Sequence, residues 1–212
     1  MIVLQSSCHM WNTERRKLLT ASNFDRVCKM RATTSCKNLV HSISYANFST
    51  KGTQYGIANE PVAKRKMAEE HDGLACEDAI MEVKCPLSAD KYEVRKMLSI
   101  MASYCPVVNR KVLLERGSNY YYQVQGQLYI TGRKNCYFMV YTSRWMTYEI
   151  TENDEFWSNR RAQSLFYKEC LLEELVNPQF TKMFVKADIQ DPIYITTAQQ
   201  KAKSATRKRH DI

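Results

Sequence analysis

The sequence predicts an α/β fold in which a mixed β-sheet carries helices on its faces. Polar and apolar residues alternate with a strand period at 79–85, and the apolar segments 136–142 and 147–150 have strand composition. Helical segments are expected at about 53–70 and 121–130, between these strands. Because strands and helices alternate along the chain, a sheet packed against helices is the expected architecture.

Shorter helices are expected around this sheet. Ser22 and Asp25 have the spacing of a capping box, so a helix is predicted to begin at Ser22. Residues 32–52 are rich in Ser, Thr and Asn and predict a loop. Gly132 is expected to end the 121–130 helix. Further helices are predicted at 13–19, 88–103 and 154–176.

Composition indicates a folded protein without a membrane span. The 212 residues are 44% hydrophobic and 25% charged, which predicts one folded domain over 1–180 and a basic tail over 181–212. The longest apolar run, Cys136–Tyr141, is far shorter than a membrane helix, and the opening residues do not form a signal peptide. An intracellular location is expected.

The cysteines predict neither a disulfide framework nor a zinc site. There are eight of them and no CxxC pair. Zinc ligands normally occur in close pairs, and disulfides are expected in secreted chains. Buried, reduced thiols are the expected state.

The charge balance favours a polyanionic partner. Lys and Arg outnumber Asp and Glu by 31 to 22, a net charge of +9. Nucleic acid is favoured over a membrane surface because no long basic amphipathic helix is visible. Residues 196–212 carry five basic residues against Asp211, so part of the excess is also compatible with a solvated tail or a nuclear targeting signal.

Asp72, Glu82 and Lys84 form the most specific chemical pattern. The strand period places Glu82 and Lys84 on one face, and a two-residue turn at 77–78 would bring Asp72 diagonally next to Glu82. Two carboxylates and the strand carbonyl of Val83 are hard oxygen ligands of the kind that Mg²⁺ or Mn²⁺ takes. The alternative is an exposed Glu–Lys pair beside an ordinary Asp-Gly turn.

Four ordered blocks resemble the YqaJ-type viral recombinases, a family that includes the lambda phage exonuclease. The first is the PD-(D/E)xK-like pattern, His71-Asp72-Gly73-Leu74 through Met81-Glu82-Val83-Lys84-Cys85-Pro86. The other three blocks are Arg15 with 19–24, 55–63, and 121–132. The resemblance implies a restriction-endonuclease-like mixed β-sheet flanked by α-helices, lacking one strand or hairpin because only residues 61–71 separate two blocks.

The resemblance also implies roles for individual residues. Asp72, Glu82 and the Val83 carbonyl would hold Mg²⁺ or Mn²⁺, while Lys84 would position the attacking water. Glu60 would lie at the edge of the metal site, since it shares a helical face with Met67; a surface position is the alternative.

Two further pairs take their roles from the resemblance. Gln125 and Tyr129, one helical turn apart, are similar to the QxxxY element that supports the catalytic face and DNA. Arg15 and Ser22 would bind the 5′-phosphate of the digested strand; Arg16 competes with Arg15, and Ser22 is also explained by helix capping.

The resemblance implies a metal-dependent deoxyribonuclease, a 5′ to 3′ exonuclease acting on double-stranded DNA ends in recombination or repair. It allows a homo-oligomer or a single-strand annealing partner, and no membrane partner is expected. Two departures favour an inactive DNA-binding or protein-interaction descendant. Glu70 and His71 replace the usual Ser and Pro, and a helix continuing to Glu70 would draw Asp72 away from Glu82.

Overall fold

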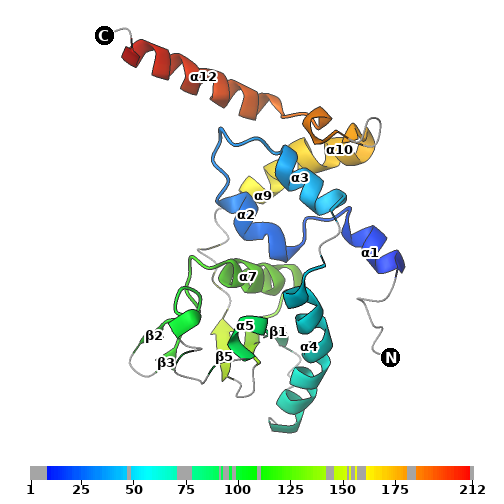
Figure 1. Cartoon of the computed structure of the whole chain (residues 1–212), viewed down its shortest axis with the longest axis vertical. Helices are drawn as coiled ribbons and strands as arrows, with labels where there is room; N and C mark the ends of the chain where they lie inside the picture. The colour runs from blue at the N-terminus through cyan, green and yellow to red at the C-terminus, as the bar shows by residue number, and fades with distance from the viewer. Residues whose placement is uncertain are drawn as a thin grey trace. The chain divides into compact units, whose positions relative to one another are not determined.

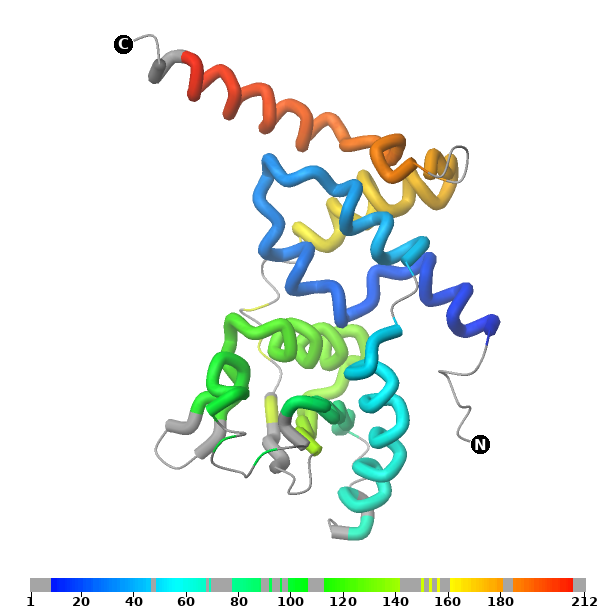
Figure 2. The backbone as a smooth tube through the Cα atoms, viewed as in Figure 1, coloured from blue at the N-terminus to red at the C-terminus, as the bar shows by residue number. Residues whose placement is uncertain are grey.

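The computed structural model is drawn in Figure 1, and Figure 2 shows in grey the residues that are left undescribed. The described residues are 9–46, 49–70, 78–90, 92, 96, 99–108, 111–141, 146–151, 153, 156, 161–180 and 185–210.

The chain divides into two compact units, which are considered separately. Unit 1 comprises residues 1–47 and 159–212, and unit 2 comprises residues 48–158. The division at residue 180 expected from the sequence stays a prediction.

A mixed sheet forms the centre of unit 2, as predicted. Strand β1 (Ala79–Lys84) runs parallel to β4 (Asn135–Val140), with Glu82 opposite Phe138. Strand β5 (Met146–Thr151) pairs with β4 in the antiparallel direction, so the sheet order is β1-β4-β5. A separate two-stranded ladder joins β2 (Val107–Val108) to β3 (Lys111–Val112).

Helix α7 (Asn119–Thr131) covers one face of this sheet and α4 (Lys51–Glu70) the other (Figure 1). Side chains of β4 alternate between the two layers: Phe138 packs with the α7 layer and Met139 with the α4 layer. The α7 layer also contains Val124, Leu128, Cys136, Val140 and Ile150, and the α4 layer contains Ala63, Met67, Val83, Cys85 and Tyr141.

The bounds of α7 follow from its capping residues. The Ser118 hydroxyl accepts a hydrogen bond from the Tyr121 backbone N–H at 3.2 Å, which satisfies one free amide of the first turn. Gly132 ends the helix in the left-handed conformation with φ of 66°, where its N–H bonds back to the last turn. The predicted stop at Gly132 is confirmed, and the helix extends one or two residues beyond the predicted 121–130 at each end.

The predicted helix at 53–70 is confirmed as α4, which includes Pro61 and continues to Glu70. The short apolar run 74–76, which would pair with 79–85 across the predicted turn, lies outside the described residues. Of the helix expected at 88–103, the described part begins as α5 (Leu87–Asp90).

Unit 1 is helical, and two predictions there are wrong. The segment 32–52 was expected to be a loop, but α3 (Lys37–Ser44) forms because Leu39, Val40 and Ile43 reach a shared core. Its apolar residues recur with helical spacing despite the polar composition around them.

The predicted start of the next helix at Ser22 is also wrong: the helix forms and buries Phe24 and Val27, but it begins two residues later. A 3₁₀ turn, η2 (Ala21–Asn23), precedes the short α2 (Phe24–Cys28). Neither Thr20 nor Asn23, the residues at the cap positions, makes a side-chain capping bond, and Ser22 Oγ instead lies 3.0 Å from Thr20 Oγ1. The capping box therefore does not form. The first helix, α1 (His9–Arg15), begins earlier than the predicted 13–19.

The remaining elements of unit 1 complete its core. The predicted 154–176 helix is described over α9 (Arg161–Phe166), the π-helical turn η3 (Tyr167–Leu171) and α10 (Leu172–Val176). The 3₁₀ turn η4 (Lys186–Asp188) leads to α12 (Ile193–His210), whose Ile195 is fully buried. In the described part of the chain, no helix combines the length and apolar character needed to cross a membrane.

Substituting Gly132→Ala is expected to lower the free energy of unfolding by about 1–2 kcal/mol, since an L-residue is strained at positive φ. A Cβ at this position would meet no atom within 4 Å, so the cost is purely conformational. Urea denaturation measures it. Gly52→Ala is the matched control: it lies in the first turn of α4, and this substitution should be neutral or stabilising. Equal losses in the two variants would contradict the conformational explanation.

Candidate functional site

Glu82 and Lys84 lie side by side on the face of β1 that is covered by α7, as the strand period predicts. Lys84 Nζ is 2.7 Å from Glu82 Oε1. The two side chains are only 14% and 21% exposed, Glu82 being the more buried. The pair is therefore part of a protein interior and not an exposed surface pair, the alternative that the sequence left open.

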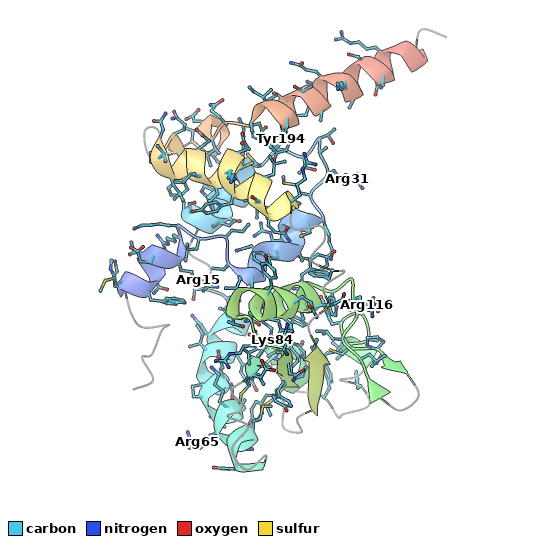
Figure 3. The ribbon with its side chains drawn as sticks, turned by 180° about the vertical axis from the view of Figure 1, so that it is seen from behind. Arg15, Arg31, Arg65, Lys84, Arg116 and Tyr194 are labelled. Carbon is cyan, nitrogen blue, oxygen red and sulfur yellow. The ribbon has the colours of Figure 1, made fainter. Side chains whose placement is uncertain are left out.

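Two glutamines of α7 complete the surroundings of this pair, whose Lys84 is labelled in Figure 3. Gln123 donates from Nε2 to Glu82 Oε1 at 2.8 Å and accepts from Lys84 Nζ at 2.9 Å. Gln127 donates from Nε2 to Glu82 Oε2 at 2.7 Å. Three donors thus surround one carboxylate, which compensates for the loss of water around its charge.

The amide oxygen of Gln127 has a different environment. Gln127 Oε1 is buried and has no hydrogen-bond partner. Its orientation is fixed by charge, because the amide must turn its NH₂ group toward the Glu82 carboxylate. Gln127 therefore contacts Glu82 through its NH₂ group, while its own amide oxygen has no hydrogen-bond donor.

Tyr120, one turn before Gln123, encloses the lysine. Lys84 Nζ lies 5.0 Å from the centroid of the Tyr120 ring, a distance at which the ammonium is attracted to the aromatic face. Burial, with smaller contributions from Tyr104, Cys105 and Glu82, raises the pKa of the Tyr120 hydroxyl. The ring therefore presents a neutral, apolar wall to the ammonium group.

Of the other two predicted metal ligands, Asp72 and Val83, only Val83 is described. Asp72 lies outside the described residues. Val83 points its side chain into the α4 layer, which leaves its backbone between Glu82 and Lys84 on β1. Within the described ranges, no three His, Cys, Asp or Glu residues gather as a metal-binding group.

Glu60 lies on α4, near the end of β1, and is not turned into the core as expected. Its side chain is 45% exposed and pairs with Lys64 at 2.6 Å. Burial and then the Glu60 charge raise the pKa of the Cys85 thiol to about 11, while Lys84 lowers it. Cys85 packs in the α4 layer, on the face of the sheet opposite to Glu82. The charge of Glu60 therefore acts on that face of the sheet.

Gln125 and Tyr129 do not face Glu82. Gln125 is fully buried, and its Oε1 accepts the Asn153 backbone N–H at 2.9 Å. Tyr129 is 43% exposed. In the described contacts, the helix face that meets Glu82 instead carries Gln123 and Gln127, and the roles expected for Gln125 and Tyr129 stay predictions.

Arg15 and Ser22 belong to unit 1, and both are exposed. Arg15 is the last residue of α1, and Ser22 lies in the η2 turn. Helix α2, which follows, has only five residues. Their role as 5′-phosphate ligands stays a prediction.

Comparisons with known proteins give a partial match of sequence and a match of fold. The sequence model of the viral alkaline exonuclease family matches residues 3–103. The crystal structure of LHK-Exo in complex with dAMP superposes with a TM-score of 0.59 at 18% identity, covering 82% of this chain and 97% of that one. Over residues 3–103 the chain is therefore similar to the viral alkaline exonucleases.

A second crystal structure of LHK-Exo, an alkaline exonuclease from Laribacter hongkongensis, gives a TM-score of 0.57 at 18% identity. It covers 82% of this chain and 96% of that one. At this identity the likeness establishes the alkaline exonuclease fold alone. No curated protein sequence matches the chain significantly.

Gln123 and Gln127 contact the Glu82–Lys84 pair, although the sequence pattern pointed to Gln125 and Tyr129. The spacing Gln125–Tyr129 and the spacing Gln123–Gln127 are the same, so spacing cannot choose between them. The position around the helix does not choose either: at 100° per residue, Gln123 and Gln125 lie equally far on either side of Val124, which faces the sheet. The choice depends on which of these side chains meets the charged pair of β1.

Loss of an amide on either helix face should destabilise the fold, for different reasons. Gln125→Leu should lower the free energy of unfolding by about 1–3 kcal/mol, because it leaves the Asn153 N–H without its acceptor. Gln127→Leu should also lower it by about 1–3 kcal/mol, because it removes one of the donors to the buried Glu82 carboxylate. Urea denaturation of both variants measures these losses. An unchanged free energy of unfolding in Gln127→Leu would contradict the support of Glu82 by this amide.

Three buried thiols of unit 2 should lower the free energy of unfolding at alkaline pH. Burial raises the pKa of Cys105 and Cys85 to about 11 and that of Cys136 to about 12, from an ordinary 9.0. The free energy of unfolding is unaffected below pH 9 and should decrease between pH 9 and 11, where only the unfolded chain loses these protons. Urea denaturation across this range tests it. Cys105→Ala should show a shallower decrease, and an unchanged slope would contradict the shift.

Proposed function

We propose that the chain is a metal-dependent deoxyribonuclease that hydrolyses phosphodiester bonds, working 5′ to 3′ from the ends of duplex DNA. The observation that carries this proposal is the buried Glu82–Lys84 pair held by Gln123 and Gln127. It lies on the strand of the exonuclease-like motif, in a chain with the alkaline exonuclease fold.

The donor set fits a hard divalent cation. Glu82 Oε2 accepts one described hydrogen bond, so it retains acceptor capacity, and the Gln127 oxygen beside it is buried without a donor. Glu82, the Val83 carbonyl and Asp72 would hold Mg²⁺, with Mn²⁺ as a substitute. When bound, the cation would supply Lewis-acid stabilisation of the charge that develops on the phosphate.

Lys84 would orient the attacking water. Its Nζ is fixed by Glu82 and Gln123, which use two of the three ammonium donors. The third donor can hold a water or a phosphate oxygen at a defined place. The Gln123 amide bridges Glu82 and Lys84, so it would help to hold the Lys84 ammonium in place for this water.

The wider setting is part of the same proposal. A role in recombination or repair, a homo-oligomer or an annealing partner, and a nuclear location for a protein with a basic tail all follow from the resemblance and the charge. An inactive DNA-binding descendant is the second candidate. Its support is that α4 continues without interruption to Glu70, directly before the motif.

Purified protein, linear duplex DNA with or without a 5′-phosphate, and Mg²⁺ or EDTA test the activity. We expect degradation in Mg²⁺ only, faster on the 5′-phosphorylated DNA. Lys84→Ala should reduce the rate by about 10²–10⁴-fold, the range for a residue that positions a proton-transfer partner.

Mg²⁺ binding, followed by calorimetry, gives a readout that is independent of turnover. Lys84→Ala should bind Mg²⁺ at least as tightly as the wild type, because the ammonium that pairs with Glu82 is removed; Glu82→Gln should bind it more weakly. DNA binding without degradation in any metal would instead support the inactive descendant.

A further inference from the structure

The last helix of unit 1 carries a dense run of positive charge. In the nine residues Lys201–Arg209, five are basic and none is acidic. Lys201, Lys203 and Arg207 all have exposed side chains on α12. No ion pair to a carboxylate is recorded for these three among the described residues.

The start of this helix is fixed to the body of unit 1. Ile195 is fully buried in the helical core, and Gln199 Nε2 donates to the Thr33 carbonyl at 3.2 Å. Just before the helix, the Asp191 carboxylate accepts from the Cys36 backbone N–H at 2.8 Å and from Ser35 Oγ at 2.9 Å. The basic run therefore extends from an anchored base and does not begin in a free tail.

The 31–36 loop adds one more charge to this region. Arg31 is exposed and lies two residues before Thr33, which bonds to α12. Figure 3 labels Arg31 and Tyr194, which mark this loop and the start of α12. We call the exposed side chains of Arg31, Lys201, Lys203 and Arg207 the basic surface.

The helix offers no apolar face beyond its base. After Ile195 its largest apolar residue is alanine; Lys203 and Arg207, one turn apart, share one face of the helix, and Lys201 lies on another. A helix that docks in a protein groove or lies on a membrane needs a stripe of large apolar residues. A polar helix with charge on several sides instead suits a partner that offers regularly repeated negative charge.

We propose that the basic surface contacts the phosphate backbone of duplex DNA outside the catalytic site. This inference rests on the proposed function for the choice of DNA as the polyanion. The run Lys201–Arg209 rises about 12 Å, and duplex DNA carries one phosphate per ~1.7 Å of axis. Several phosphates are therefore within reach of one helix, whatever the base sequence.

The salt dependence of binding counts these contacts. Each phosphate contact contributes a slope of about −0.9 in log K against log salt. The variant Lys201→Gln/Lys203→Gln/Arg207→Gln should reduce the steepness of this slope by about 2–3, together with a weaker affinity at every salt concentration. Fluorescence anisotropy of an end-labelled duplex, measured in EDTA with the full chain, gives the slope.

The charge-retaining variant Lys201→Arg/Lys203→Arg/Arg207→Lys is the matched control and should keep the wild-type slope. Circular dichroism of both variants checks that α12 persists. An unchanged slope in the Gln variant overturns the proposal. The proposal also fails if the Gln variant binds DNA as the wild type does but no longer binds vesicles of anionic lipid, because the partner of the basic surface is then a lipid surface.

The two proposals fail in different ways. Degradation of DNA in Mg²⁺ by wild type and Gln variant alike, with identical salt slopes, leaves the nuclease function intact and overturns the role of the basic surface. A salt slope that is steep in the wild type and shallower in the Gln variant, without any DNA degradation, supports the proposed role of the basic surface and overturns the proposed nuclease activity.

Discussion

The burial of the Glu82 carboxylate against α7 is the constraint on which unit 2 depends. A buried charge without partners is strongly destabilising, so the helix must present hydrogen-bond donors at one defined height on the sheet. Gln123 and Gln127 do so, and Lys84 supplies the opposite charge. A shift of α7 by one residue along β1 would take both glutamine donors away from this carboxylate and leave it with Lys84 alone among these partners.

The same constraint explains how α7 combines packing with chemistry. Val124 and Leu128 bind the helix to the apolar part of the sheet, while the glutamines in the same arc reach the two charged residues of β1. The capping bond at Ser118 and the left-handed turn at Gly132 set the length of the helix between these contacts. The polar site is therefore built into a core layer, and its side chains have little freedom to move.

Unit 1 uses two carboxylates in a similar way: the buried Glu174 and the half-buried Asp191 join segments that are distant in sequence. Glu174 is 3% exposed and accepts from Tyr45 Oη at 2.7 Å and from the Phe180 N–H at 2.9 Å. Asp191 holds the 35–36 backbone next to the base of α12. Each carboxylate replaces lost water with donors from several segments, so the helical core is specified by polar as well as apolar contacts.

By itself, the sequence determined the period-two strand that places Glu82 beside Lys84, the apolar strands that follow, and the stop of α7 at Gly132. These features depend on local geometry: alternation along a strand and the left-handed conformation that favours glycine. Ser22 shows the limit of local patterns, because a capping box has the same spacing whether or not a helix follows. Only the tertiary structure decided that 37–44 is a helix, that Gln123 and Gln127 and not Gln125 face the carboxylate, and that Glu60 is half-exposed. Each of these depends on which layer of a core an element meets, and that is set by contacts between residues far apart in the chain.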